Sequence, residues 1–306
     1  MDDSFNIPVV LLIFNRPKVT EELVRKLETI KPSKLYLIAD GPRKSKKEDQ
    51  ELCSKTRKVI EKAINWKCEI KKKYSEKNQG CGICISSGLN WVFEQEEYAI
   101  ILEDDCIPAT SFFSFCEELL IKFRYDTRVM HICGSRWNLE RIRPEVSYFF
   151  SKYSHVWGWA TWRRAWNLYD YDLETWPIVK NGNYLNSVFE SQKEVNSFTK
   201  IFDTYYTNSL KSGWATQWFY SVIINNGMAI VPNSNLINNK GEIGTHCSGM
   251  SYFYNRPVDE GYKITNHPKI MIVDKWFDNY HSKKHILKRV SFCKRLFNYL
   301  KKLISR

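Results

Sequence analysis

A short apolar run that ends in three consecutive carboxylates is the feature that most constrains this chain of 306 residues. The run covers residues 99–102, includes β-branched side chains and is followed by a break at Pro108. These properties are typical of a buried strand rather than of a helix. Glu103, Asp104 and Asp105 therefore stand at the end of a strand, where their charges repel one another unless a cation neutralises them.

The local sequence supplies no such cation. Residues 78–121 contain no Lys or Arg, although the whole chain has a formal net charge of +12. A hard divalent cation such as Mg²⁺ or Mn²⁺ would suit carboxylate oxygens. A solvated loop, or acids that cap the helix expected from residue 111, would explain the same pattern without a metal. The triplet alone does not decide between a metal site and a plain loop.

The amino-terminal half alternates between strand and helix patterns. Five apolar runs predict strands, at residues 8–14, 34–39, 66–70, 99–102 and 129–134. Segments with helical spacing of apolar residues lie between them, for example at residues 20–27 and 111–123. This alternation predicts an α/β fold in which helices flank a central, mostly parallel sheet.

Polar residues follow several of the predicted strands. Arg16, Asp40, Asn78 and the triplet at residues 103–105 all come directly after a strand. Ligands of parallel sheets bind at the carboxyl ends of the strands. We therefore expect these side chains to share one edge of the sheet, which favours a binding site over a solvated loop.

Positive charge is concentrated at the carboxyl end. Residues 283–306 hold nine Lys and Arg and no acid, so the rest of the chain carries only 12 − 9 = +3. Apolar residues recur there at roughly helical spacing, which predicts a basic amphipathic helix on an anionic membrane surface. A solvated helix, or one packed on the body, is the alternative. A nucleic-acid-binding face is not expected, because the body lacks the necessary charge.

The cysteine pattern and the amino-terminal sequence predict the cellular compartment of the protein. The nine cysteines are odd in number and lie mostly in apolar runs, which predicts reduced thiols in the cytosol. The lone C-x-x-C at residues 81–84 is interpreted as packing at a helix start. No apolar run reaches the length of a membrane span, and the acidic start is not a secretory signal. With the basic tail, this predicts a cytoplasmic protein peripheral to the inner face of the membrane.

Several segments together resemble a known family. Residues 99–108, with the two phenylalanines that follow, are similar to the metal-site segment of the N-acetylglucosaminyltransferase I-like enzymes. Residues 15–17, 38–42 and 158–159 look like the corresponding parts of bacterial members. The resemblance covers roughly residues 7–250. It implies a GT-A fold and a metal-dependent hexosyl- or N-acetylhexosaminyltransferase that uses a nucleotide sugar, with UDP the expected nucleotide.

The resemblance also implies the course of the reaction and the division of the chain. The acceptor would be a hydroxyl of a cell-surface glycan or lipid-linked glycan, and the transfer is expected to invert the anomeric carbon. Residues 1–135 would form the nucleotide-sugar-binding lobe and residues 136–280 the acceptor-binding lobe of the same domain, with residues 281–306 as the basic amphipathic tail.

Individual roles follow from the same resemblance. Asp105 is expected to bind Mn²⁺ or Mg²⁺, and a metal on the diphosphate would stabilise the charge that develops as the nucleotide leaves. Asp104 is expected on the ribose side and Asp40 at the base. The expected donor-binding residues are Arg16, Asp40, Asn78, Gly80, Glu103 and Asp104.

The catalytic base is the least defined part. Inversion requires a group that deprotonates the acceptor hydroxyl. Similar enzymes often carry an Asp where this chain has Ala215. Glu242 is the nearest remaining candidate and Asp172 the second, although Glu242 is equally well an exposed loop acid. Without a base, a retaining mechanism or a lost activity has to be considered.

The remaining candidates come from the second half. His246 could reach the metal or the diphosphate, although a lone loop histidine is more often structural. Trp159 is expected to contribute to an acceptor site and Gln217 to contact the acceptor, while at least half of the tryptophans in residues 157–166 are expected in the core, together with Trp214 and Trp218.

Two other functions remain open. A sugar nucleotidyltransferase should carry a glycine-rich triphosphate loop after the first strand, and residues 15–18 are too short and lack glycine. A catalytically impaired glycan-binding protein on the same fold is favoured by Ala215 and opposed by the intact triplet.

Overall fold

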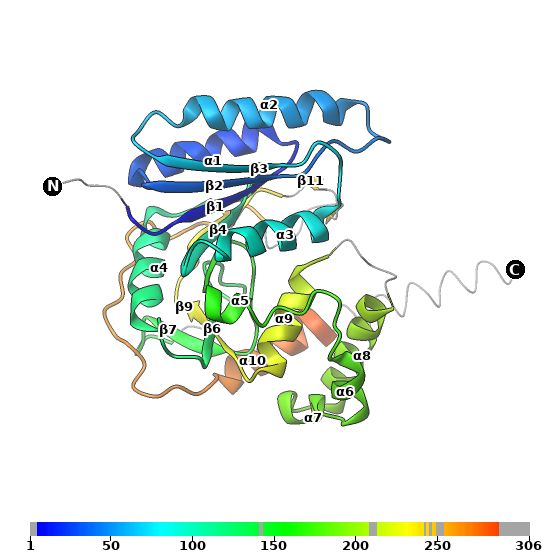
Figure 1. Cartoon of the computed structure of the whole chain (residues 1–306). Coiled ribbons are helices and arrows are strands. Elements are labelled where there is room, and N and C mark those ends of the chain that lie inside the picture. Colours follow the sequence, from blue (N-terminus) through cyan, green and yellow to red (C-terminus); the bar gives the residue numbers. More distant parts are fainter. Residues whose placement is uncertain are drawn as a thin grey trace, which may run out of the picture.

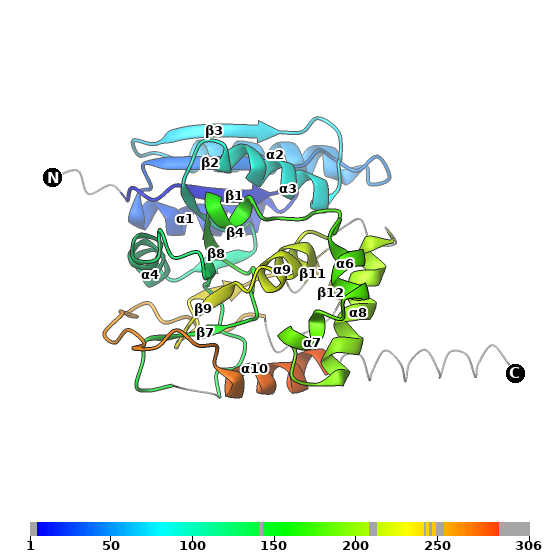
Figure 2. The same cartoon turned by 60° about the horizontal axis from the view of Figure 1, so that its bottom comes forward.

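Figures 1 and 2 show a computed structural model of the chain. It describes residues 5–140, 143–207, 213–241, 243–244, 247–248 and 254–287. The main sheet has eight strands in the order β3-β2-β1-β4-β8-β6-β9-β7. Strands β8 and β7 run antiparallel to their neighbours, and the other neighbouring strands pair in parallel. The predicted α/β fold with a mostly parallel central sheet is confirmed.

The strands of the main sheet are β1 (Val9–Ile13), β2 (Lys34–Ala39), β3 (Glu69–Tyr74), β4 (Tyr98–Glu103), β6 (Val129–Cys133), β7 (Tyr148–Ser151), β8 (Trp159–Trp162) and β9 (Met228–Pro232). Two short antiparallel pairs accompany it: β5 (Cys106–Pro108) with β10 (Ile237–Asn239), and β11 (Ile243–Gly244) with β12 (Cys247–Ser248). The helices of the first half are α1 (Pro17–Ile30), α2 (Glu48–Ala63), α3 (Cys81–Phe93) and α4 (Thr110–Lys122). Those of the second half are α5 (Arg163–Trp166), α6 (Trp176–Asn181), α7 (Leu185–Val188), α8 (Gln192–Tyr206), α9 (Ala215–Ile224), α10 (Lys275–His281) and the π-helix η1 (Ser282–Leu287).

The period of two in β1 builds a core on each face of the sheet. Val9 and Leu11 point into the core covered by α1, α2 and α4, whereas Val10 and Leu12 point into the core covered by α3, α5 and α9. Successive side chains of a strand point to opposite faces, so a strand buried on both sides reads as one continuous apolar run. Helices accordingly lie on both sides of the sheet (Figure 2).

The third strand lies later than expected, at β3 instead of residues 66–70. Strand β3 is at the edge of the sheet and pairs only with β2. Its sequence is mostly Lys and Glu, and its side chains are half-buried or exposed. Charged residues on an edge strand discourage pairing with other chains, but they also remove the apolar signal on which a strand prediction depends.

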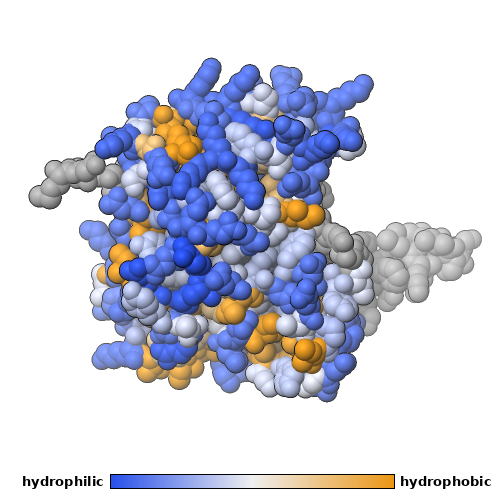
Figure 3. Space-filling model, viewed as in Figure 1, coloured by the Kyte–Doolittle hydropathy of each residue, from blue (hydrophilic) through white to orange (hydrophobic). Residues whose placement is uncertain are grey.

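The outer surface over α2 is that of a helix which packs on the sheet by one face. In Figure 3 the side chains over α2, at the top of the view, are mostly hydrophilic. The helix buries only four residues, one of them Ile60, against the sheet side. An amphipathic helix of this kind is stabilised by the packing of one face.

The main sheet continues past residue 135, the expected boundary between the two lobes. Strand β6 precedes this boundary and pairs with β8 and β9, which follow it. Helices α6, α7, α8 and part of α9 enclose a separate apolar cluster beyond the sheet. The functional division into donor and acceptor lobes stays a prediction.

The carboxyl-terminal part of the described chain packs on β7. Asp278 of α10 accepts hydrogen bonds from Ser151 Oγ at 2.5 Å and from the backbone N–H of Lys152 at 3.1 Å. Most of the predicted basic amphipathic tail, residues 288–306, lies outside the described residues. Among the helices that are described, none combines the length and the apolar character needed to cross a bilayer.

Candidate functional site

Arg16 forms ion pairs with two residues of the acidic triplet, Asp104 and Asp105. Its Nη1 lies 2.6 Å from Oδ2 of Asp105, and its Nη2 forms an ion pair with Oδ1 of Asp104. The partners are close because β1, which precedes Arg16, pairs in parallel with β4, which precedes the acids. The predicted meeting of these residues at the carboxyl edge of the sheet is confirmed. The cation that the local sequence lacks comes from a residue 89 positions earlier.

Asp104 has no free oxygen in this arrangement. Its Oδ1 is engaged by Arg16, its Oδ2 accepts from the backbone N–H of Phe14 at 3.3 Å, and its side chain is 2% exposed. A carboxylate held in this way positions Arg16. The expected contact between the Asp104 side chain and the ribose stays a prediction.

Glu103 and Asp105 keep the site negative. Among the described residues, no hydrogen bond or ion pair reaches the carboxylate of Glu103, and burial together with the charges of Asp105 and Asp104 raises its pKa. Burial opposes the charge on Arg16, but the two aspartates outweigh it and raise the pKa of Arg16. The raised pKa of Glu103, about 8, leaves this carboxyl mostly protonated at neutral pH, so Asp104, Asp105 and Arg16 sum to −1, and ionisation of Glu103 brings the sum to −2. The cluster therefore attracts a further cation.

Asp40 is fully occupied as well. Its Oδ1 accepts from the backbone N–H groups of Gly41 and Gln79, each at 2.8 Å, and its Oδ2 accepts from Asn78 Nδ2 and the N–H of Gly80, each at 2.9 Å. A carboxylate has about four lone-pair sites, and all are used. Asp40 thus ties the end of β2 to the loop before α3. The expected contact of its side chain with a base stays a prediction, and it would require one of these hydrogen bonds to be exchanged or shared.

The residues tied by Asp40 lie directly before α3. Asn78 is exposed on the surface, and its Nδ2 also donates to the carbonyl of Gly41 at 2.8 Å. Gly80 has a φ of +86°, a conformation that L side chains rarely adopt, and precedes the first residue of α3. Their contact with a donor stays a prediction. The hydrogen bonds to Asp40 fix the geometry of the loop in which they lie.

The loop that begins at β10 covers Asp105 from the other side. The backbone N–H of Lys240 donates to the carbonyl of Asp105 at 2.8 Å, and that of Gly241 donates to Asn239 Oδ1 at 2.7 Å. A Cβ at Gly241 would overlap Oδ2 of Asp105. No sequence pattern placed Gly241 against the triplet.

The C-x-x-C segment serves packing, as expected. Burial raises the pKa of both Cys81 and Cys84, which keeps these thiols protonated. Charges on Glu103, Asp40 and Arg16 all act on Cys81, so the start of α3 lies between the triplet and the Asp40 loop. The seven cysteines that the structure describes with their side chains are free thiols.

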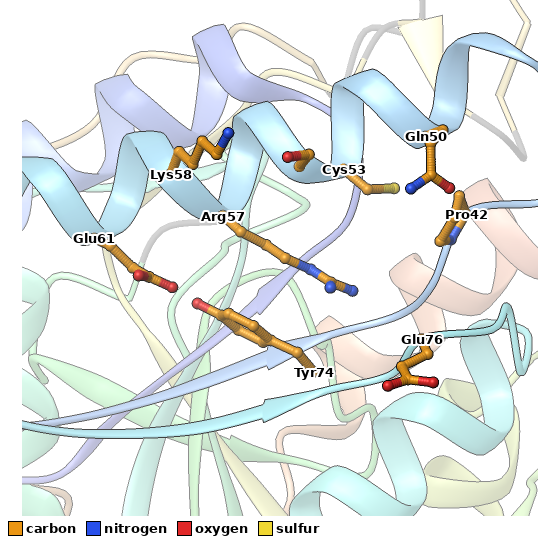
Figure 4. A pocket seen from close by; sticks show the side chains of 9 residues that line it. Pro42, Gln50, Cys53, Arg57, Lys58, Glu61, Tyr74 and Glu76 are labelled. Atoms are coloured by element: carbon orange, nitrogen blue, oxygen red, sulfur yellow. The ribbon is translucent and has the colours of Figure 1, made fainter.

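A cavity of about 420 Å³ lies behind the Asp40 loop, between α2 and β3 (Figure 4). Arg57 and Tyr74 stand in it, with the guanidinium 4.8 Å from the ring centre. Arg57 Nη2 donates to the carbonyls of Asp40 and Ser75, at 2.9 and 2.8 Å. The cavity does not include the triplet, and Arg57 supports the Asp40 loop from behind.

The acceptor residues expected from sequence are in the core. Trp159 is 0% exposed and stacks on His131 and Trp214, with ring centres 5.1 and 5.5 Å apart. Gln217 is 3% exposed, and its Nε2 donates to the carbonyl of Gly213 at 3.0 Å. Neither side chain offers a surface to a sugar, so both assignments are corrected. The expectation that Trp214 and Trp218 belong to the core is confirmed.

The candidates for base and histidine ligand are only partly described. Glu242 and His246 lie outside the described residues. Asp172 is exposed in the bend that follows α5. It is close to Tyr171, whose pKa is raised by burial and by the charges of Asp172 and Cys81. Asp172 is thus on the side of the molecule where α3 begins.

The carboxylate oxygens of this site suit a hard dication that would also bind oxygens of a substrate. Within the described ranges, no three His, Cys, Asp or Glu side chains form a complete metal centre. Mg²⁺ commonly takes only one or two carboxylates and completes its shell with water and phosphate oxygens. Asp105 fits this role, because its Oδ1 is approached only by the Cys106 thiol, at 3.7 Å, among described residues. Asp104 does not, because both its oxygens are engaged.

Comparison with known proteins gives distant likenesses. No protein-family model and no curated protein matches the chain. Among solved structures it is similar to residues 1–349 of TarS from S. aureus, with 14% identity over 76% of this chain and a TM-score of 0.43. It spans 59% of that TarS chain.

Two further structures are similar. Mouse xyloside xylosyltransferase 1, in its apo form, has 10% identity over 70% of this chain and 81% of its own, with a TM-score of 0.33. A UDP-glucose pyrophosphorylase complexed with UDP-glucose has 14% identity over 47% and 62%, with a TM-score of 0.27. These scores are too low to carry an argument about activity, and the family resemblance stays an interpretation of the motifs.

Proposed function

We propose that this protein is a glycosyltransferase that moves a sugar from a nucleoside diphosphate, UDP, to a hydroxyl of a glycan. The observation that carries the proposal is the cluster of Glu103, Asp104, Asp105 and Arg16 at the carboxyl edge of the sheet. Its net charge is negative, and a bound dication would favour the ionised form of Glu103. The first turn of α3 begins at the same edge, and helix amino termini favour anionic groups.

Each residue of the site has a separate role in this proposal. Asp105 would hold Mn²⁺ or Mg²⁺, which when bound stabilises negative charge on a leaving diphosphate. Asp104 orients Arg16, whose side chain is 27% exposed and brings positive charge to the same place. Asn78 and Gly80 would border the donor on the side of the Asp40 loop.

Transfer requires a balanced exchange at the anomeric carbon. The acceptor oxygen bonds to this carbon, the bond from the carbon to the β-phosphate oxygen breaks, and the proton of the hydroxyl passes to a carboxylate. Asp172 is the described candidate for this base, and Glu242 the candidate outside the described residues. A base on the face opposite the leaving group would give inversion.

Acceptor and location extend the proposal. A lipid-linked or cell-surface glycan acceptor and a cytoplasmic position on the inner face of the membrane are both supported by the basic residues of 283–306. Removing residues 288–306 should abolish sedimentation with vesicles rich in anionic lipid and leave the melting temperature unchanged. Undiminished sedimentation would contradict the membrane part alone.

A thermal-shift panel tests the central proposal. We expect UDP and UDP-sugars to stabilise the protein when Mn²⁺ is present and much less without it, because the ligand binds only the folded state. Asp105→Asn should lose this response, whereas Glu94→Gln, an exposed acid in the same lysine-free stretch, should keep it. No shift with any nucleoside diphosphate would refute the proposal, and nucleotide-sugar synthesis from UTP and a sugar 1-phosphate would favour a nucleotidyltransferase.

A further inference from the structure

An exposed apolar segment lies outside the predicted site, directly before α10. Ile270 and Ile272 are 68% and 65% exposed. The residues that alternate with them point the other way, because Met271 and Val273 pack against the core covered by α1, α2 and α4. Successive side chains of an extended segment stand on opposite faces. Ile270 and Ile272 therefore share an outer face that the core does not need.

The segment is held along β7, the last strand of the sheet. The backbone N–H of Ser147 donates to the carbonyl of Asn266 at 2.8 Å, and that of Asp274 donates to the carbonyl of Phe150 at 2.7 Å. Val273 also forms a parallel bridge with Phe150. These contacts lie on both sides of the two isoleucines in the chain, so a fixed backbone presents them.

From this segment to the end of η1, the exposed side chains are all apolar or basic. They are Lys269, Ile270, Ile272, Lys275, Trp276 and Lys283. The two acids of the same stretch face the body: Asp274 pairs with Arg143 at 2.5 Å, and Asp278 is 1% exposed. In Figure 2 the segment and α10 follow one another along the lower edge of the molecule. Large apolar side chains beside lysines are typical of surfaces that enter the interface of an anionic bilayer.

Charge favours a lipid surface over other occupants. From residue 261 to the carboxyl end, the chain carries twelve Lys and Arg, and Asp274 and Asp278 are its only acids. A second copy of the chain, or residues 288–306 folded back, would bring positive charge against positive charge. Anionic headgroups attract basic residues instead. Residues 288–306 follow η1 directly, so the exposed segment and the predicted basic tail belong to one continuous basic stretch.

We propose that Ile270 and Ile272, with Lys269 and Lys275 beside them, form a docking surface that enters the interface of an anionic lipid bilayer. The inference rests on the membrane part of the proposed function and adds a second contact, made by the folded body. A terminal basic segment alone would hold the protein at the bilayer without setting its orientation. A contact from the body as well fixes the orientation of the sheet relative to the membrane.

Vesicle sedimentation of the full-length protein tests the surface, with vesicles of equal parts phosphatidylglycerol and phosphatidylcholine. Ile270→Ser and Ile272→Ser together should lower the partition coefficient about tenfold, because two apolar side chains no longer leave water on binding. Removing residues 288–306 should still abolish sedimentation, because two isoleucines without the basic tail bind a bilayer only marginally.

Ile178→Ser is the matched control. Ile178 is 67% exposed on α6, and Figure 2 shows this helix on the opposite side of the molecule from the segment before α10. This variant should sediment like the wild type. Both isoleucine changes are at exposed positions, so the melting temperature should stay that of the wild type in every variant.

Hydrogen exchange identifies the occupant. Vesicles should slow the exchange of the backbone amides of residues 269–273. If these amides exchange faster after removal of residues 288–306 in the absence of vesicles, the tail covers the surface. If light scattering shows a dimer that the serine substitutions dissociate, a second copy covers it. Either result overturns the proposal.

The sedimentation results separate the remaining failures. Wild-type sedimentation of the doubly substituted variant would refute the docking surface and leave the basic tail as the membrane contact. Absence of sedimentation in the wild type would refute the membrane part of the proposed function together with the surface. The transferase function would not be affected, because the thermal shift with UDP and Mn²⁺ tests it without vesicles.

Discussion

Replacing Arg16 by Met tests whether its guanidinium holds the acidic cluster together. The side chains of Asp104, Asp105 and Arg16 are 2%, 12% and 27% exposed. Removing one partner of a buried ion pair costs about 3–5 kcal/mol, because the other charge stays buried and unpaired. Arg16 is partly solvated, so we expect Arg16→Met to lower the free energy of unfolding by about 2–3 kcal/mol. Urea unfolding of the metal-free protein measures this difference.

Mn²⁺ should reverse part of the loss. Arg16→Met removes one positive charge from the cluster, so a dication is attracted more strongly than in the wild type. If Mn²⁺ binds the variant about tenfold more tightly, it restores about 1.4 kcal/mol at the same free metal concentration. The comparison is made by urea unfolding of both proteins with and without MnCl₂.

Arg25→Met is the matched control. Arg25 pairs with Glu21 on the same helix, but its side chain is 72% exposed, so its removal should change stability by less than about 0.5 kcal/mol. An Arg16→Met variant that is no less stable than Arg25→Met would show that the cluster does not depend on Arg16. An equal response of variant and wild type to Mn²⁺ would show that Arg16 and the metal do not share the site.

Three further changes test other parts of the structure. Asp40→Asn places an amide N–H₂ group against backbone N–H groups that donate to the Asp40 carboxylate. Because donors then face donors, urea unfolding should show that the free energy of unfolding falls by about 2–4 kcal/mol. Gly241→Ala should weaken UDP binding with Mn²⁺ about tenfold by calorimetry, because the Cβ displaces the Asp105 carboxylate. Gly261→Ala should not, because a Cβ there meets only Asp259, at an ordinary contact distance of 3.9 Å. Burial lowers the pKa of His131 to about 3, so the unfolded state binds more protons below about pH 6.5. His131 should therefore contribute a fall in stability of about 1.4 kcal/mol per pH unit between about pH 6.5 and pH 3. Burial also lowers the pKa of His155 and of His281, so urea unfolding of His131→Gln should show a smaller dependence on pH but not its loss.

The local sequence was sufficient for the elements and for the edge on which the site lies. Strands β1, β2 and β4 are buried on both faces, so their apolar runs are continuous and visible without a structure. The positions of Arg16 and the triplet followed from the rule that polar residues after parallel strands share one edge. Strand β3 was misplaced because an edge strand carries no such apolar run.

The sequence did not determine the role of each side chain at that edge. Whether Asp40 and Asp104 have a free oxygen depends on hydrogen bonds to residues far away in the chain, such as Gln79 and Phe14. Trp157 and Trp159 illustrate the same limit. They are two residues apart and equally aromatic, yet Trp159 lies in the core and Trp157 is partly exposed.

The sequence by itself determined that a sheet would present three adjacent acids at its carboxyl edge, because short-range periodicity and chain order set which residues end each strand. The tertiary structure alone decided that Arg16 pairs with two of these acids and that Trp157, unlike Trp159, is partly exposed. Both outcomes depend on the pairing of strands and the packing of helices across long separations in the chain, which no local pattern encodes.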